Sequence, residues 1–367
     1  MQHLRAPTYS NKEQLDPAAL TITKVPGSLT NAVFFVSYPS KPTVLLRIYG
    51  PSSGSLISRP RELHILHVLS SKYRIGPQVY GTFENGRIEE YFESTTLSKA
   101  ELCDAEISRW VACRMAEMHT VDLSLLNSKP STSEDESMEA EEIAAVANFK
   151  SWLRPASQVL SLPAISPSTL KQFDLASLQK EWEAYMRWLD AHGQGQADRK
   201  KVFAHNDAQC GNLLRVKHVK KGSPDHHQII VVDFEYAAPN HPACDIANHF
   251  HEWTTAYSEA DEPHISNPSL YPTLDERRNF YKAYLKQSAY LSTGTARDPT
   301  EAEMNELDEE VRLWSPAVHA MWSLWGFVQA REDVEAGVEK PELDFDNVGF
   351  SLWRAELFRR EIRALGV

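Results

Sequence analysis

The residues best suited to chemistry lie in two short polar segments, each of which follows an apolar run. The first is Phe203–Asn212 (FAHNDAQCGN) and the second is Ile229–Glu235 (IIVVDFE). Asp207 and Asp233 offer carboxylates and Asn212 offers an amide oxygen, which are ligand types that Mg²⁺ accepts. Phosphoryl transfer needs one carboxylate to orient the attacking hydroxyl and further oxygen ligands to hold Mg²⁺ against the phosphates. The pattern therefore predicts transfer of a phosphoryl group to a hydroxyl.

The spacing of these residues supports this prediction. Asn212 follows Asp207 by five positions, and Asp233 comes directly after a run of four Ile and Val residues. The protein-kinase catalytic loop has the same His-x-Asp with Asn five positions later, and its metal-binding Asp begins an Asp-Phe-Gly further on. A single His-x-Asp or Asp-Phe is common in unrelated proteins. Their occurrence together, in this order, favours phosphoryl transfer over a chance match.

The composition is that of an ordinary globular protein. The chain has 367 residues, of which 42% are hydrophobic and 24% charged, and its formal net charge is -12. This length predicts one large domain or a two-lobed enzyme, and the negative charge argues against nucleic acid as the main partner. No window approaches the roughly 20 apolar residues of a membrane span, and the N-terminus has no signal-peptide pattern. We expect a cytoplasmic protein without stable membrane insertion, whose four cysteines, lacking Cys-x-x-Cys spacing, are reduced thiols.

The elements expected before the two polar segments form a small, sheet-rich part. Runs of β-branched and aromatic residues predict strands, and Glu84-Asn85-Gly86 is a hairpin turn signal between two of them. Apolar residues at helical spacing predict a helix over 60–72. The expected strands are residues 21–23, 32–36, 43–49, 79–83 and 87–92. We therefore expect an N-lobe over residues 1–92, followed by a hinge over 93–99.

The rest of the chain, residues 100–367, is expected to be a larger and mostly helical C-lobe. Helices are predicted over 104–121, 170–190 and 275–291, and the region from about 301 is also largely helical. Residues 127–142 are acidic and Ser-rich, which predicts a surface insertion that is disordered or weakly helical. The expected fold class is therefore α+β, with a bilobal, protein-kinase-like fold.

Three features of the expected N-lobe are candidate nucleotide contacts. Arg47 ends an apolar strand where a protein kinase has its phosphate-binding Lys, and Glu62 on the next helix is expected to pair with it. The alternative is that Arg47 is an exposed residue at a strand edge. The loop between the first two strands could cover phosphates with backbone N–H groups, or it is an ordinary hairpin. This loop consists of Gly27, Ser28, Leu29, Thr30 and Asn31.

A second group of candidates lies in the expected C-lobe. We expect Asp245 to be buried and to fix the loop around His205 by hydrogen bonds. Glu252 is a candidate anionic wall for a cationic substrate, and a surface carboxylate is the alternative. Trp322 and Trp325 lie three positions apart, on one side of a helix. They are either core residues or part of an aromatic box, since π faces hold quaternary ammonium groups.

Motifs along nearly the whole chain resemble those of the choline/ethanolamine kinases. HNDAQCGN, VVDFEYAAPN and DIANHFHEW form a highly specific combination, and GSLTN, VLLRIYG, IGPQVYGTFENGRIEEYF and HAMWSLWGFVQAR resemble the same family in order. The acidic insertion and the stretch around 150–200 are not covered. The resemblance implies a bilobal kinase-like fold and transfer of the ATP γ-phosphate to choline. The product, phosphocholine, belongs to the CDP-choline route of phosphatidylcholine synthesis, and the family often forms homodimers.

The resemblance also implies roles for single residues. Asp207 matches the catalytic base, and Asn212 and Asp233 match the Mg²⁺ ligands. The residues that match ATP contacts are Gly27 to Asn31, Arg47, Gln209, and the hinge from Glu90 and Tyr91 to Thr96. Those that match the choline pocket are Glu252, Tyr257, Trp322 and Trp325.

The sequence departs from the family pattern at several positions. Ser28 stands where the phosphate loop usually has a second glycine, and Glu90-Tyr91 replaces a Gln followed by an apolar residue. Ala336 stands where the family has a further aromatic residue of the choline pocket. Alternative functions are an ethanolamine or dual-specificity kinase, an aminoglycoside-type phosphotransferase, and a catalytically inactive binding protein. The two tryptophans favour choline, because a primary ammonium needs hydrogen-bond acceptors rather than indole faces.

Overall fold

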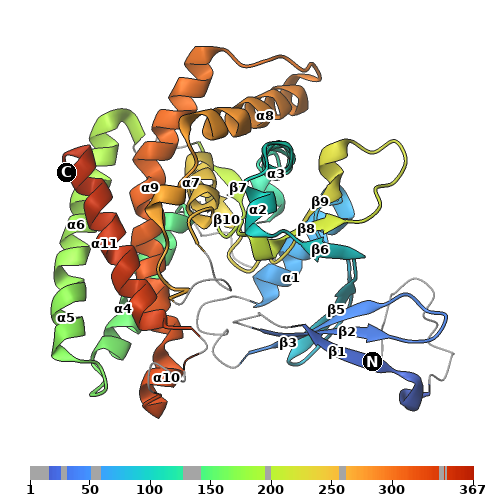
Figure 1. Ribbon diagram of the computed structural model, residues 1–367, viewed down its shortest axis with the longest axis horizontal. Coiled ribbons are helices and arrows are strands. Elements are labelled where there is room, and N and C mark those ends of the chain that lie inside the picture. Colours follow the sequence, from blue (N-terminus) through green and yellow to red (C-terminus); the bar gives the residue numbers. More distant parts are fainter. Residues whose placement is uncertain are drawn as a thin grey trace, which may run out of the picture. The chain divides into compact units, whose positions relative to one another are not determined.

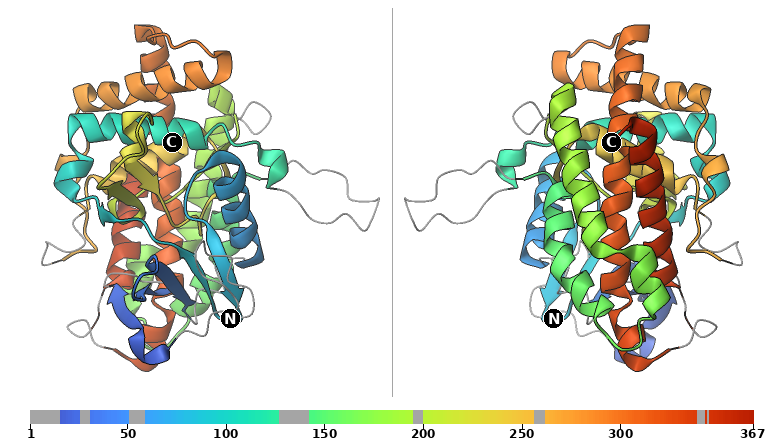
Figure 2. Two further views of the ribbon diagram at one scale, coloured as in Figure 1. Left: turned by 90° about the vertical axis from the view of Figure 1, so that its right-hand side faces the viewer. Right: turned by 90° about the vertical axis from the view of Figure 1, so that its left-hand side faces the viewer.

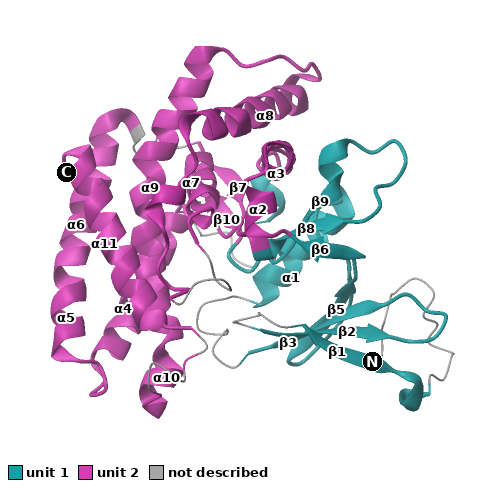
Figure 3. Ribbon diagram, viewed as in Figure 1, with its two compact units in different colours: residues 1–96, 121–129, 211–236 teal, residues 97–120, 130–210, 237–367 magenta. Residues whose placement is uncertain are grey.

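The computed structural model describes residues 16–25, 31–50, 59–126, 142–194, 200–255, 262–338, 343 and 345–367 (Figure 1). These residues belong to two compact units (Figure 3). Unit 1 draws on residues 1–96, 121–129 and 211–236, and unit 2 on residues 97–120, 130–210 and 237–367. The two polar segments found in the sequence are thus divided, because the chain passes from unit 2 to unit 1 between Cys210 and Gly211.

Unit 1 contains a five-stranded antiparallel sheet and a smaller three-stranded sheet. The strand order of the larger sheet is β1-β2-β3-β5-β4, and that of the smaller one is β6-β8-β9. The larger sheet consists of β1 (Thr21–Val25), β2 (Asn31–Ser37), β3 (Val44–Tyr49), β4 (Val79–Phe83) and β5 (Gly86–Glu90). The smaller sheet consists of β6 (Ser94–Thr96), β8 (Leu213–Val216) and β9 (Ile229–Val231). Helix α1 (Arg59–Val68) continues into a π-turn over Leu69–Tyr73.

Unit 2 is mostly helical, with one short two-stranded sheet. That sheet pairs β7 (Val202–Ala204) with β10 (Ala238–Asn240). The helices are α2 (Lys99–Leu102), α3 (Ala105–Met118), α4 (Ala144–Leu160), α5 (Pro167–Phe173), α6 (Leu175–Leu189), α7 (Pro242–Glu252), α8 (Leu274–Thr293), α9 (Glu301–Gln329), α10 (Arg331–Ala336) and α11 (Asn347–Leu365). Figure 2 shows in its right-hand view that α9 and α11 run alongside α4 and α6.

Two helices form the centre of unit 2. Every residue of α7 is buried, and so is every residue of α9 from Leu313 to Val328. A helix that is buried on all sides lies inside a larger domain rather than on its surface. Polar residues on these two helices are therefore held in a dry environment, where hydrogen bonds and charges act strongly. This region contains most of the predicted substrate-pocket residues.

The expected fold class is confirmed, with one correction to a predicted helix and three helices that were missed. The sequence predicted one helix over 170–190, whereas the chain breaks at Asp174 into α5 and α6. Asp174 has a left-handed φ of 43° and its side chain accepts the N–H of Ser177, so it caps the second helix and ends the first. Helices α2, α4 and α7 were not predicted. Most of the acidic insertion predicted over 127–142 lies outside the described residues.

No helix among the described parts of the chain is long and apolar enough to cross a membrane.

Candidate active site

The loop that carries Asp207 is held by a buried carboxylate of α7. Asp245 is fully buried, and its two oxygens accept the backbone N–H groups of His205 at 3.0 Å and Asn206 at 2.7 Å. Asn206 has a left-handed φ of 63°, an uncommon conformation that these contacts stabilise. Burial alone would raise the pKa of Asp245, but the hydrogen bond from His119 and nearby charges hold it below its usual value. Asp245 therefore stays ionised and fixes the shape of the loop.

Asp207 itself is partly exposed on this rigid loop. Its N–H donates to the buried ring of His205 over 3.3 Å, and the N–H of Gln209 donates to the backbone oxygen of Asp207 over 2.9 Å. The His249 ring of α7 lies 2.8 Å from the backbone oxygen of Ala208. Burial lowers the pKa of His249 to about 4, so the ring is neutral and donates one N–H to this oxygen. The carboxylate of Asp207 is thus presented by a loop that α7 supports at several points.

Asn212 and Asp233 lie together in unit 1, at one end of the β8–β9 ladder. Leu213 pairs with Val231, and the N–H of Val232 donates to the backbone oxygen of Asn212 over 3.0 Å. Asp233 has a left-handed φ of 66°. A carboxylate and an amide oxygen at the same edge fit Mg²⁺, a hard cation that binds oxygen ligands. These two residues would hold the metal ion.

Gly76 helps to place the residue that follows Asp233. An ideal Cβ at Gly76 would lie 2.6 Å from the fully buried ring of Phe234, and Gly76 has a φ of +72°. Both the close approach and the left-handed backbone require glycine at this position. The buried Phe234 ring therefore anchors the chain directly after Asp233.

Arg47 contacts Asp233 within unit 1. Its Nη1 lies 2.9 Å from Asp233 Oδ2 and its Nε lies 3.9 Å from Glu89. Arg47 is buried, so it is not the exposed strand-edge residue that was the alternative. Burial alone would lower the pKa of Arg47, but the charges of Asp233 and Glu89 outweigh this effect and raise it. Arg47 therefore stays charged beside a predicted metal ligand.

The expected pairing of Glu62 with Arg47 is wrong. Glu62 instead pairs with Arg87 at 2.8 Å and with Arg59 at 2.7 Å. The reason lies in the sheet register, which places Arg87 of β5 directly opposite Arg47 of β3. Like charges directly opposite each other repel, so both arginines need carboxylates nearby. Arg47 contacts Asp233, Arg87 contacts Glu62, and Glu89 contacts both arginines.

The remaining nucleotide candidates fall partly outside the described residues. Gly27, Ser28, Leu29 and Thr30 lie outside them. Asn31, which follows, is buried; its amide donates to Glu235 over 3.2 Å and accepts from Arg59 over 3.2 Å.

The predicted hinge begins at the end of β5. The N–H of Glu90 donates to the backbone oxygen of Gln78 over 2.8 Å, and Tyr91 packs edge-on against Phe35 with ring centroids 5.0 Å apart. Both contacts tie the start of this segment to the larger sheet of unit 1.

Glu252, at the end of α7, is buried rather than a surface carboxylate. Its Oε1 accepts from Arg354 of α11 at 3.2 Å, and its Oε2 lies 3.3 Å from the hydroxyl of Thr255. One turn earlier, Asn248 accepts the indole N–H of Trp322 at 2.8 Å. Glu252 and Trp322 therefore belong to one packed region in which α7 meets α9 and α11. Tyr257 lies outside the described residues.

The two tryptophans have further aromatic neighbours in unit 2. Trp322 and Trp325 pack edge-to-face with centroids 5.2 Å apart. Trp325 contacts Phe350 of α11 at 5.8 Å, and Phe350 contacts Phe345 at 5.7 Å. The sequence did not predict that Phe345 and Phe350 lie beside the tryptophans, and the expected extra aromatic position was Ala336. The available signal was Phe350 and Arg354, four positions apart on one face of a predicted helix.

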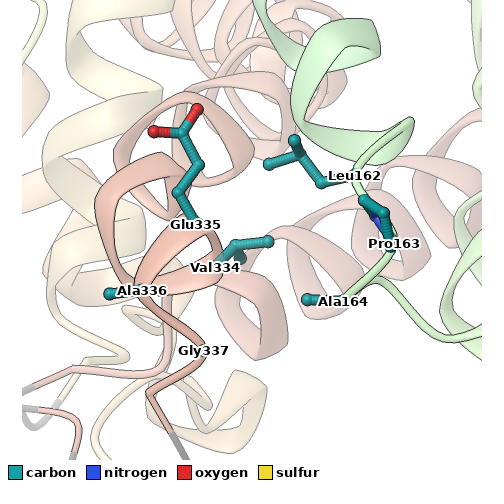
Figure 4. A pocket seen from close by; sticks show the side chains of 7 residues that line it. All are labelled: Leu162, Pro163, Ala164, Val334, Glu335, Ala336 and Gly337. Atoms are coloured by element: carbon teal, nitrogen blue, oxygen red, sulfur yellow. The ribbon is translucent and has the colours of Figure 1, made fainter.

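Ala336 belongs to a different feature, an apolar pocket of about 380 Å³ (Figure 4). Glu335 is its one charged lining residue, and the other lining residues are Leu162, Pro163, Ala164, Val334, Ala336 and Gly337. None of the predicted site residues lines it. This pocket therefore offers no chemistry of the kind that the sequence predicts.

Behind Arg354 lies a buried group of titratable residues. His251, His319 and Glu361 bring possible metal-ligand atoms within 4.8 Å of one another. However, Arg354 Nη1 lies 3.3 Å from His319 Nδ1 and can only donate. His319 must then carry its proton on Nε2, which lies 3.6 Å from Glu361. A protonated Nε2 cannot bind a metal, so the group is a hydrogen-bonded network rather than a metal site.

Both imidazoles of this network are neutral. Burial lowers the pKa of His251 and of His319 well below 6.5, and nearby positive charge adds to the effect. Ser315 donates to Glu361 at 2.8 Å, so its oxygen accepts from His251 Nε2, also at 2.8 Å. Burial raises the pKa of Glu361. Arg354 is therefore the group of this network that brings a positive charge to Glu252.

The structure thus assembles the predicted residues in two sets. One set, in unit 1, contains Asn31, Arg47, Glu62, Asn212 and Asp233, with Glu90 and Tyr91 at its edge. The other set, in unit 2, contains His205, Asp207, Gln209, Asp245, Glu252, Trp322 and Trp325.

Comparisons with known proteins bear on the family and the fold of this chain. A family model described as choline/ethanolamine kinase matches residues 22–358. A choline kinase of Schizosaccharomyces pombe is 33% identical over 95% of this chain and 84% of its own length. A choline kinase of Saccharomyces cerevisiae is 31% identical over 90% of this chain, which spans 62% of that longer protein. A solved choline kinase of Cryptosporidium parvum shares the fold, with a TM-score of 0.73 at 22% identity over 96% of this chain and 91% of that one.

Proposed function

Because this chain belongs to the choline/ethanolamine kinase family, we propose that it transfers the γ-phosphate of ATP to the hydroxyl of choline. The observation that carries the choice of choline is the buried cluster of Glu252, Trp322 and Trp325. A quaternary ammonium has no N–H to donate, so it needs a negative charge and π faces. This cluster offers both. The products are phosphocholine and ADP.

The side chains divide the work of the reaction. Asp207 orients the choline hydroxyl and accepts its proton, and its loop is held in place by Asp245. Asn212 and Asp233 bind Mg²⁺, which when bound neutralises the charge of the phosphates. Arg47 and Gln209 contact the nucleotide phosphates. Most of the rate enhancement then comes from positioning and electrostatics rather than covalent chemistry.

We propose the following roles for the remaining residues. Gly27 to Asn31 cover the phosphates, residues 93–99 act as the hinge between lobes, and Glu90 and Tyr91 contact adenine. Tyr257 completes the choline pocket. The enzyme works in the cytoplasm, in the CDP-choline route, and forms a homodimer.

The test is ADP release from Mg-ATP, measured side by side with choline and with ethanolamine. We expect strong turnover with choline and weak turnover with ethanolamine. Asp207→Ala should lower kcat by about 10²–10⁴-fold, because it removes the general base, and should leave the fold intact. A preference for ethanolamine would mean that Glu252, rather than the two indoles, sets the choice of substrate. No turnover on either amino alcohol would overturn the proposal.

A further inference from the structure

We propose that Arg354 is a positioning residue that sets the preference of the amine site for a quaternary over a primary ammonium, through its contact with Glu252. This proposal rests on the proposed function, in which Glu252 binds the cation of the substrate. Arg354 lies on α11, 102 positions away from Glu252 along the chain.

One oxygen of the Glu252 carboxylate already has a charged donor. Arg354 Nη2 donates to Oε1 at 3.2 Å. The Thr255 hydroxyl lies 3.3 Å from Oε2, but its single proton is closer to the backbone oxygen of Glu252, at 2.9 Å. The side chains of Arg354 and Glu252 are only 2% and 5% exposed, so water does not compete for their contact. Part of the hydrogen-bonding capacity of Glu252 is therefore occupied by Arg354.

Two further contacts hold the Arg354 side chain in its position beside Glu252. Its guanidinium lies over the ring of Phe350, 5.0 Å from the centroid, and its Nη1 donates to His319 over 3.3 Å. His319 is neutral and accepts this bond, while its other nitrogen is directed to Glu361. The guanidinium is thus held by α9 and α11 with one edge on Glu252.

The cations of ethanolamine and choline differ in the hydrogen bonds that they need. The ammonium of ethanolamine has three N–H donors, and leaving any of them without an acceptor in a buried site costs free energy. The trimethylammonium of choline has none, so it needs only the charge of Glu252 and the faces of nearby aromatic rings. The positive charge of Arg354 weakens attraction to both cations. Its occupation of Oε1 disfavours only ethanolamine, which gives the site its preference.

The experiment compares kcat/KM for choline and for ethanolamine in Arg354→Met and in wild type, with the KM for ATP measured alongside. Methionine fills similar space without charge or donors. We expect the choline-to-ethanolamine ratio to fall about 10-fold, the equivalent of roughly 1.4 kcal/mol. The KM for ATP should not change. Arg354→Lys, which keeps a charged donor, should restore most of the ratio.

The matched control is Arg359→Met on the same helix. Arg359 pairs with Glu181 at 2.8 Å, and its loss disturbs α11 without touching Glu252. We expect this variant to keep the wild-type ratio. An equal fall in kcat/KM for both amino alcohols in folded Arg354→Met, with the ratio unchanged, would reduce Arg354 to a structural residue and overturn the proposal.

A milder variant decides the question if Arg354→Met does not fold. Arg354→Gln keeps a polar side chain at this position but removes the charged donor to Oε1, and we expect the ratio to fall about 2- to 3-fold. An unchanged ratio in folded Arg354→Gln would then overturn the proposal. Wild-type enzyme that is silent on both amino alcohols would instead overturn the proposed function, and this inference would fall with it.

Discussion

Both units bury arginines against carboxylates, but they use these pairs in opposite ways. In unit 1, Arg47 contacts Asp233, whose side chain is still 21% exposed, so the pair lies where a ligand can reach it. In unit 2, Arg354 contacts Glu252, which is only 5% exposed, and Arg354 lies behind it among neutral imidazoles. The first pair suits phosphates and a metal ion, and the second suits an organic cation. The two pairs therefore differ in exposure, because the carboxylate of the first is open to solvent and that of the second is almost sealed from it.

The neighbours of the two pairs differ as well. Around Arg47 and Arg87 the positive charges are balanced by buried carboxylates, some of which are shared, in a ladder set by the register of β3 and β5. Around Arg354 the neighbours are aromatic rings and neutral histidines. Unit 1 thus depends on charge balance, and unit 2 on the exclusion of water. Substitutions in each unit test this contrast.

Loss of charge balance in unit 1 should have the largest effect on stability. Glu62→Gln removes a carboxylate that Arg87 and Arg59 share, while Arg87 keeps Glu89, so we expect a cost of about 1.5–3 kcal/mol, the range for a hydrogen bond to a charged group. Urea unfolding followed by circular dichroism measures it. The control is Glu181→Gln, which breaks a partly exposed pair with Arg359 and should cost less than about 1 kcal/mol. Equal costs for both variants would contradict the contrast.

Loss of Arg47 should affect the nucleotide and not the amino alcohol. Arg47→Met removes a preorganised positive charge from the phosphates, so kcat/KM for ATP should fall about 10²–10³-fold. The KM for choline should stay within a factor of about two of wild type, since Glu252 and the two indoles belong to unit 2 and Arg47 to unit 1. Arg61→Met, an exposed change on α1, is the control. A parallel rise in the KM for ATP and in the KM for choline would contradict the prediction that Arg47 acts on the nucleotide alone.

Loss of an indole should affect choline and not ATP. Trp322→Leu keeps an apolar side chain but removes the π face, worth about 2 kcal/mol in a dry site, so the KM for choline should rise roughly 30-fold. Trp322→Phe keeps a ring and loses only the bond to Asn248, so its effect should be smaller. Trp314→Leu, at a fully buried position of the same helix, is the control for packing. Similar KM values for choline in Trp314→Leu and Trp322→Leu would mean that Trp322 is a core residue rather than part of the choline pocket.

The neutral histidines of unit 2 should make stability depend on pH. The folded-state pKa of His251 is lowered well below 6.5, so unfolding takes up a proton and stability falls as the pH drops below 6.5. His251→Gln keeps a donor for Ser315 but cannot titrate. It should lower the slope of unfolding free energy against pH by up to about 1.4 kcal/mol per pH unit.

Urea unfolding between pH 8 and pH 5 measures this slope. Glu361, whose folded-state pKa is raised, works in the opposite direction in wild type and variant alike. The exposed His67→Gln in unit 1 should leave the slope unchanged. An identical slope in His251→Gln and wild type would mean that His251 is not held neutral by the fold.

Local sequence determined the chemistry of this protein. Asp207 and Asn212 share one short loop, and Asp233 follows its strand directly, so spacing alone indicates phosphoryl transfer. The strands of the larger sheet in unit 1 and most of the long helices were also predictable, because their apolar periodicity and turn residues lie within a few positions of each other. The same local patterns, read together, identified the family.

Only the tertiary structure decided which side chains meet. Glu62 was assigned to Arg47 by its place along the chain, yet the register of β3 and β5 gave it to Arg87. The contact of Arg354 with Glu252 spans 102 positions and depends on how α7, α9 and α11 pack. Local propensity carries no information on such distant partners. Burial, sheet register and helix packing select them, because each buried charge must find a counter-charge or hydrogen-bonding partner among the residues that the fold brings near it.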